Sequence, residues 1–144
     1  MRVVDILNRK GRHVETIRPD AKVLMAVHRM RMQNVGALVV TRDGARVEGV
    51  LSERDIVRCL TRHGGDLLDM SVVAVMSRGV PLCSPDDSLQ LVMAQMTRTR
   101  NRHLPVVEDG ILCGIVSLGD VVKHRLEEME LETSVLRDAY LTRH

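Results

Sequence analysis

Apolar residues recur with a helical period in two stretches that match each other. In each stretch the spacing is four residues and then three: Val23, Val27 and Met30 in the first, and Leu89, Met93 and Met96 in the second. Such spacing places the apolar side chains on one face of a helix. It predicts a helix that runs to about Gln33 and an equivalent helix in the second half of the chain.

A short apolar run follows each predicted helix, at residues 37–41 and 103–107. An Asp-Gly pair comes next, and a second apolar run returns at residues 46–51 and 112–116. Two apolar runs separated by an Asp-Gly turn are typical of a β-hairpin. Residues 14–17 and 80–83 are also expected to be extended, one ahead of each helix.

The two halves keep the same order at a nearly constant offset. Pro19-Asp20 is matched by Pro85-Asp86 at an offset of 66, and Gly49 is matched by Gly114 at an offset of 65. A fixed period of this kind indicates one supersecondary unit used twice. The predicted unit is a strand, a helix, a hairpin and a second helix.

Each hairpin ends in the pattern Gly-x-x-Ser-x-x-Asp. The residues are Gly49, Ser52 and Asp55 in the first half, and Gly114, Ser117 and Asp120 in the second. Ser-x-x-Asp is a capping signature, so one interpretation is only that two helices start well. The other interpretation is a nucleotide site, since a helix N-terminus suits phosphate and a carboxylate can accept from ribose hydroxyls.

The two ends of the chain also read as helices. Residues 2–10 predict a short amphipathic helix that packs beside the first repeat. From about residue 118 to 141 nothing interrupts a helix, and six residues follow a heptad spacing: Val122, Leu126, Met129, Thr133, Leu136 and Tyr140. A heptad seam is typical of a helix that packs on a second chain. The alternative is a helix that lies along its own domain.

Composition narrows the classes of function. The formal net charge of +2 is too small to favour nucleic acid or a membrane, and Tyr140 is the one aromatic residue, so no base-stacking platform is expected. Three cysteines without C-x-x-C spacing favour neither disulfides nor zinc. Without a signal peptide or a membrane span in the sequence, the cytoplasm is the expected location.

Catalytic and metal motifs are not found in the sequence. The six histidines have no metal-ligand spacing, no serine lies in a G-x-S-x-G elbow, and there is neither a P-loop nor a G-x-G-x-x-G fingerprint. We therefore expect no turnover and no metal. An enzyme with an unrecognised site is a further hypothesis, beside the two functions described below. Its test is whether a nucleotide incubated with the protein is converted.

Three features taken together carry a family resemblance: the two Gly-x-x-Ser-x-x-Asp motifs, the Pro-Asp pairs, and the run Arg102-His103-Leu104-Pro105-Val106-Val107. With them the chain resembles a tandem pair of cystathionine β-synthase (CBS) domains, which is also called a Bateman module. The resemblance covers about residues 14–123. It implies an α+β fold of two pseudo-twofold β-α-β-β-α repeats, with an N-terminal helix and a long C-terminal helix. The expected boundaries are 1–13 (N-terminal helix), 14–62 (first repeat), 63–76 (linker), 77–123 (second repeat) and 124–144 (tail).

The resemblance also implies a ligand, an adenine nucleotide such as AMP, ADP or ATP, or a dinucleotide such as NAD. It would bind in a cleft between the repeats. The second-repeat pocket would use Ser117 and Asp120, with Val80 and Leu82 along the base and Arg102, His103 and Pro105 at the flanks. The first-repeat pocket would use Ser52 and Asp55, with Thr16, Ile17 and Ala37. The second pocket is expected to hold phosphate better, because Gly36 and Ala37 stand where the second repeat has Arg102 and His103.

The function implied is a non-catalytic sensor that signals by conformational change to an unknown protein effector in trans, as a homodimer. The alternative is a structural dimerisation module with no physiological ligand, in which Ser and Asp are only caps. Nucleic-acid binding has little support, and the sequence does not name the nucleotide.

Overall fold

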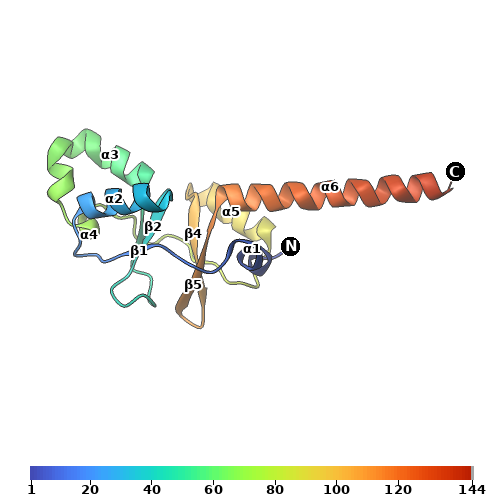
Figure 1. Ribbon diagram of the computed structural model, residues 1–144, viewed down its shortest axis with the longest axis horizontal. Coiled ribbons are helices and arrows are strands. Elements are labelled where there is room, and N and C mark those ends of the chain that lie inside the picture. The colour runs from blue at the N-terminus through green and yellow to red at the C-terminus, as the bar shows by residue number, and fades with distance from the viewer. Residues whose placement is uncertain (144) are drawn as a thin grey trace.

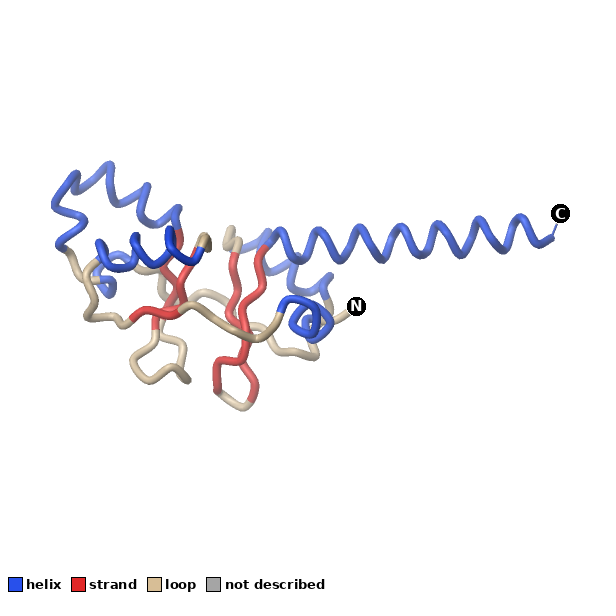
Figure 2. The backbone as a smooth tube through the Cα atoms, viewed as in Figure 1, coloured by secondary structure: helices blue, strands red, loops and turns tan. Residues whose placement is uncertain are grey.

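The computed structural model describes residues 1–143, and it shows two small α+β repeats side by side with a long helix projecting from the second (Figure 1). The strands of both repeats lie in the middle of the body, and helices flank them on both sides (Figure 2). This is the α+β architecture that the sequence predicts.

The first repeat follows the predicted order of elements. It comprises β1 (Thr16–Ile17), α2 (Val23–Gln33), β2 (Ala37–Val40), β3 (Gly49–Ser52) and α3 (Glu53–His63). Strand β2 lies in the centre of the sheet, parallel to β1 and antiparallel to β3. All four residues of β2 are buried, which explains why the strand reads as a continuous apolar run rather than an alternating one.

The second repeat replays the unit with a shorter leading strand. Its elements are α5 (Leu89–Thr99), β4 (His103–Glu108), β5 (Ile111–Ser117) and α6 (Leu118–Arg143). Strands β4 and β5 form an antiparallel hairpin through Asp109-Gly110, both at positive φ. The expected leading strand is reduced to one parallel bridge between Cys83 and Val106.

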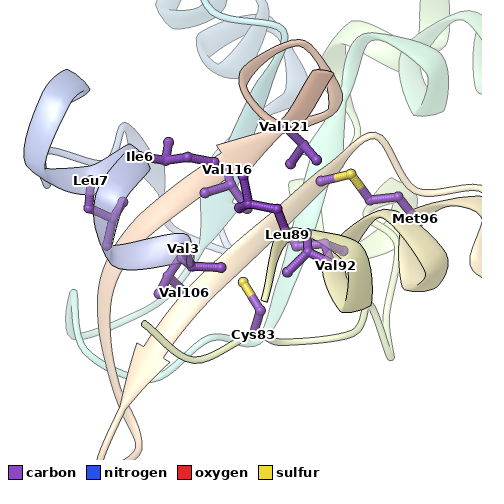
Figure 3. Close-up of a cluster of buried hydrophobic side chains, with 11 residues drawn as sticks. Val3, Ile6, Leu7, Cys83, Leu89, Val92, Met96, Val106, Val116 and Val121 are labelled. Carbon is purple, nitrogen blue, oxygen red and sulfur yellow. The ribbon is translucent and has the colours of Figure 1, made fainter. Parts of the chain in front are cut away.

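The N-terminal helix α1 (Val3–Lys10) does not pack where the sequence analysis placed it. It was expected beside the first repeat, but Val3, Ile6 and Leu7 are buried in the core of the second repeat (Figure 3). The chain runs from α1 into the first repeat afterwards. The amphipathic pattern shows that α1 must bury one face, but it does not show which core offers the space.

Helix α4 (Val72–Val75) makes the reciprocal exchange. It follows the first repeat through a short 3₁₀ helix, η1 (Gly64–Asp69), and its residues Val72 and Val75 are buried in the first core. Leu67 of η1 is buried in the same core. Each core therefore includes a helix from outside its own repeat: α4 packs in the first core and α1 packs in the second.

The same backbone contacts dock both exchanged helices. The first two N–H groups of each helix donate to carbonyls of the loop that precedes α2 or α5. The bonds are Val3 to Asp87 (2.9 Å), Val4 to Pro85 (2.9 Å), Val72 to Ala21 (2.8 Å) and Val73 to Pro19 (2.9 Å). The Pro-Asp pairs thus lie a few residues before the helices, and their role is to receive the N-termini of α1 and α4.

The motif glycines are required by this exchange. A Cβ atom on Gly49 would lie 2.7 Å from the backbone oxygen of Ser77 and 2.9 Å from the sulfur of Met76, both at the end of α4. On Gly114 it would lie 2.6 Å from a methyl of Leu7 on α1. Glycine therefore allows each exchanged helix to approach the strand that ends in the motif, β3 in the first repeat and β5 in the second.

Gly49→Ala is expected to lower the free energy of unfolding by about 1–3 kcal/mol, the usual cost of overpacking. Gly114→Ala is expected to cost less, because a Leu7 side chain can shift more easily than the Ser77 backbone. The measurement is urea unfolding.

Gly119→Ala is the matched control. Its Cβ would meet its nearest neighbour at 3.7 Å inside α6, so we expect a change within about 1 kcal/mol and in the favourable direction. Equal stability of Gly49→Ala and the unmodified protein would contradict the packing role of Gly49.

Candidate functional site

The first motif forms a complete capping box at the start of α3. The backbone N–H of Ser52 donates to Asp55 Oδ2 at 2.9 Å, and the N–H of Asp55 donates to Ser52 Oγ at 3.3 Å. Asp55 is 3% exposed, and its Oδ1 also accepts from Ser77 Oγ at 2.7 Å and from Arg58. Both oxygens of this carboxylate are therefore already used, and a ribose could bind only by displacing a partner such as the exposed Arg58 guanidinium.

The second motif caps α6 in the same way. Ser117 N–H donates to Asp120 Oδ2 at 2.9 Å, and Asp120 N–H donates to Ser117 Oγ at 3.1 Å. Lys10, at the end of α1, donates to the same Oδ2 at 2.7 Å. Burial would raise the pKa of Asp120, but the hydrogen bonds from Lys10 and Ser117 outweigh it and hold the pKa below its ordinary value. Asp120 is therefore a carboxylate at neutral pH.

A cleft of about 720 Å³ opens between the repeats at the first motif. We name it the arginine cleft. Ser52 and Asp55 line it from the first repeat, and Val80, Arg102 and His103 line it from the second. The wall from the second repeat is the loop between α5 and β4, so the cleft exists only because the repeats are paired.

The arginine cleft is strongly cationic. Five arginines line it against two carboxylates, Glu53 and Asp55, which leaves a formal charge of +3. The arginines are Arg54, Arg58, Arg78, Arg100 and Arg102. Arg58 pairs with Asp55, whereas the other four make no ion pair within residues 1–143. Guanidinium groups without a carboxylate partner are suited to phosphate.

A second cleft, of about 400 Å³, opens at the second motif. We name it the Ser117 cleft. It is lined by Ser117, by Ala37 at the start of β2, and by Lys10, His13 and Glu15 of the N-terminal segment. Its one lysine is balanced by its one carboxylate, and Lys10 is held by Asp120. This cleft has no comparable excess of positive charge.

His103 lies at the junction of the two clefts and lines both. Its ring packs over Gly36, where a Cβ atom would meet His103 Cε1 at 3.5 Å. Burial lowers the pKa of His103, and the charges of Lys10 and Arg102 act in the same direction. Asp120 and Glu53 oppose them only in part, so the ring is neutral at pH 7.

The structure groups the predicted residues differently from the sequence analysis. Val80 and Arg102 were assigned to the pocket of Ser117, but they line the cleft of Ser52 and Asp55. Ala37 was assigned to the first-repeat pocket, but it lines the cleft of Ser117. Each cleft joins the motif of one repeat to the helix–strand loop of the other, so the excess of arginines lies at the first motif and not at the second.

Five predicted residues line neither cleft. One of them is Asp120, whose carboxylate accepts from Lys10 and from the backbone N–H of Ser117. Ile17 and Pro105 are buried within the repeats, Leu82 is exposed on the surface, and the backbone carbonyl of Thr16 accepts from Arg29.

Sequence reasoning missed Ser77 and Arg78 and could not place Arg54. Ser77 and Arg78 follow α4, and the signal that would have found them is the exchange of helices, which brings the end of α4 against the first motif. No group of three or more His, Cys, Asp or Glu within residues 1–143 is arranged as a metal site. In the same range, none of the helices has the length and apolar character needed to cross a bilayer.

Known proteins match both the sequence and the structure. The CBS domain family profile matches residues 3–62 and 72–127. The mitochondrial CBS domain-containing protein CBSX3 of Arabidopsis thaliana is 32% identical, over 96% of this chain and 71% of its own. The CBS domain-containing protein YhcV of Bacillus subtilis is 34% identical, over 78% of this chain and 79% of its own.

Solved structures of CBS domain proteins are also similar to this chain. The CBS-domain containing protein ATU1752 from Agrobacterium tumefaciens has a TM-score of 0.83 and 40% identity, covering 87% of this chain and 99% of that one. A hexameric CBS-CP12 protein from bloom-forming cyanobacteria has a TM-score of 0.74 and 27% identity, covering 85% of this chain and 70% of that one. Proteins built on CBS pairs are generally regulatory modules that bind adenosine ligands. With two matched repeats and this fold, the chain belongs to the CBS domain family.

Proposed function

We propose that this protein is a non-catalytic sensor that binds an adenine nucleotide in the arginine cleft. The observation that carries the proposal is the set of four cleft arginines that form no ion pair with any carboxylate of the described residues, beside the N-terminus of α3. The exposed N–H groups of a helix start favour negative charge, and here the arginines add to them. Adenosine is the expected nucleoside because CBS pairs generally bind adenosine ligands.

The charge of the cleft favours a ligand with more than one phosphate. A formal charge of +3 exceeds what one phosphate monoester neutralises, because a monoester carries about −1.5 to −2 at pH 7. ADP or ATP is therefore expected to bind more tightly than AMP. NAD also carries two phosphates, joined as a pyrophosphate, and is therefore one of the nucleotides to be tested.

Binding would act on the angle between the repeats. Arg54 and Arg58 stand on the first repeat, whereas Arg100 and Arg102 stand on the second. A polyphosphate between them would draw the two repeats together and relieve repulsion among the arginines. A ligand shifts such an equilibrium only through its difference in affinity for the two arrangements. The change would pass to a protein effector through a homodimer in the cytoplasm.

A structural module with no physiological ligand is the second candidate. The capping boxes favour it, because Asp55 and Asp120 already hold protein donors. Under this alternative the arginines are a solvated surface and a nucleotide gives no thermal shift. An enzymatic role would show instead as conversion of the nucleotide during incubation.

One prediction of this proposed function concerns Arg102. ATP and ADP are expected to raise the Tm of the unmodified protein more than AMP does, and Arg102→Ala is expected to weaken their binding about tenfold or more. The reason is that a hydrogen bond to a charged group is worth roughly 1.5–3 kcal/mol. Isothermal titration calorimetry with AMP, ADP, ATP and NAD measures the affinity of each nucleotide for both proteins.

Arg98→Ala is the matched control, since Arg98 is exposed on the last turn of α5 and does not line the arginine cleft. Its affinity should equal that of the unmodified protein. An equal loss of affinity in both variants would mean that the effect is only general electrostatics. If no nucleotide binds at all, the structural module with no physiological ligand is the function that remains.

The second prediction concerns pH. The pKa of His103 lies below its ordinary value of about 6.5, so the ring gains a proton only as the pH falls below that value. A bound phosphate would favour the protonated ring and raise this pKa. Binding would then take up a proton, and affinity should increase from pH 7.5 to 5.5.

His103→Asn serves as the comparison at each pH, because titration of the phosphate itself affects both proteins equally. The unmodified protein should gain affinity relative to the variant as the pH falls. A constant ratio of the two affinities across this range would place His103 away from the phosphates.

A further inference from the structure

Helix α6 continues well beyond the body of the protein. It spans Leu118–Arg143, 26 residues or about 39 Å, whereas the CBS match ends at residue 127. Its first two turns are anchored by the buried Val121 and His124. From Met129 to Thr142 every side chain is exposed, and the helix projects away from both repeats (Figure 1). The predicted helix is confirmed, and it does not lie along its own domain.

The heptad seam of this helix is uncovered. Leu126 and Met129 are each 53% exposed, and Leu136 is 71% exposed. Thr133, in the middle of the seam, donates its hydroxyl to the carbonyl of Met129 at 2.9 Å, so it needs no polar partner across an interface. An isolated helix of about 15 residues is only marginally stable in water, so a projecting segment with an apolar seam would gain stability from a partner.

The charges beside the seam specify the partner and its direction. Leu126, Thr133 and Tyr140 occupy a positions of the heptad, so Arg125 and Glu132 are at g, and Glu130 and Arg137 are at e. In a parallel, in-register pair each g residue faces the e residue of the following heptad on the other helix. Arg125 then faces Glu130, and Glu132 faces Arg137. By symmetry each pair of opposite charges occurs twice.

The antiparallel arrangement gives the reverse result. When two tails overlap fully in opposite directions, g faces g and e faces e. Glu132 then faces Glu132, Glu130 faces Glu130, and Lys123 faces Arg137. Each of these contacts joins like charges.

The charges are also available for such contacts. Glu132 and Arg137 make no ion pair within residues 1–143. Arg125 contacts Glu128 on its own helix at 2.6 Å, so the pair of Glu132 and Arg137 is the more sensitive probe.

We infer that two copies of this chain join through residues 122–140 as a parallel, in-register two-stranded coiled coil. The complementary charges belong to one sequence, so the surface is self-complementary in the way that a twofold-symmetric interface requires. Since both tails then begin at the same end, the second repeats of the two copies are brought close together at the base of the coil.

Disulfide cross-linking of the full-length chain tests the direction. Leu136→Cys is a seam position that faces itself only in the parallel register, so mild oxidation should give mainly covalent dimer. Val135→Cys lies beside it but outside the seam and serves as the matched control, and the unmodified chain controls for its three native cysteines. No excess of dimer for Leu136→Cys over Val135→Cys would overturn the inference.

Charge reversal tests the register. In the Leu136→Cys background, Glu132→Arg should slow cross-linking about fivefold or more at low salt, because two attractions become repulsions. Arg137→Glu alone should slow it similarly, and the two changes together should restore it. An antiparallel pair gives the opposite sign for Arg137→Glu, which would then attract Lys123. That sign, or a monomer at micromolar concentration by sedimentation equilibrium, would overturn the inference.

Discussion

The exchange of α1 and α4 between the repeats is the constraint on which the rest of the structure depends. A unit of about 60 residues buries too little surface to be secure alone, and here each core takes a helix from outside the unit. Full burial of Val3, Ile6 and Leu7 contributes about 1.5–3 kcal/mol for each side chain by transfer from water. The repeats therefore fold as a pair.

The same exchange builds the two clefts. Helix α1 brings Lys10 to Asp120, and the segment after α4 brings Ser77 to Asp55, so each capping carboxylate receives a donor from an exchanged helix. The motif Gly49 belongs to the same arrangement, since it makes room for the end of α4. The two clefts are thus built onto contacts that also hold the fold together.

Pseudo-symmetry of the backbone does not extend to the electrostatics. The loop before β4 carries Arg100 and Arg102 at the positions where the loop before β2 carries Asn34 and Gly36. Because each loop faces the motif of the other repeat, the arginines of the second repeat meet the capping box of the first. Two similar folds therefore enclose one cationic cleft and one cleft in which the lysine and the carboxylate balance.

The sequence by itself determined the repeat, the order of elements, both capping boxes and the length of the tail helix. These depend on local physics: helical spacing of apolar residues, Asp-Gly turns, and hydrogen bonds between residues three positions apart, such as Ser52 and Asp55. Sequence offsets also showed that Ser117 repeats the position of Ser52. The family resemblance added that motif residues would lie between the repeats.

Only the tertiary structure decided which surfaces meet. An amphipathic pattern shows that α1 buries a face but is the same whichever core receives it, so its docking on the second repeat could not be read from the chain. The crossing of the clefts has the same cause, since Arg102 is distant in sequence from Ser52 and near it only after the repeats pair. Local periodicity specifies each element, whereas the choice of partner depends on the fit of two surfaces formed by residues far apart in the sequence.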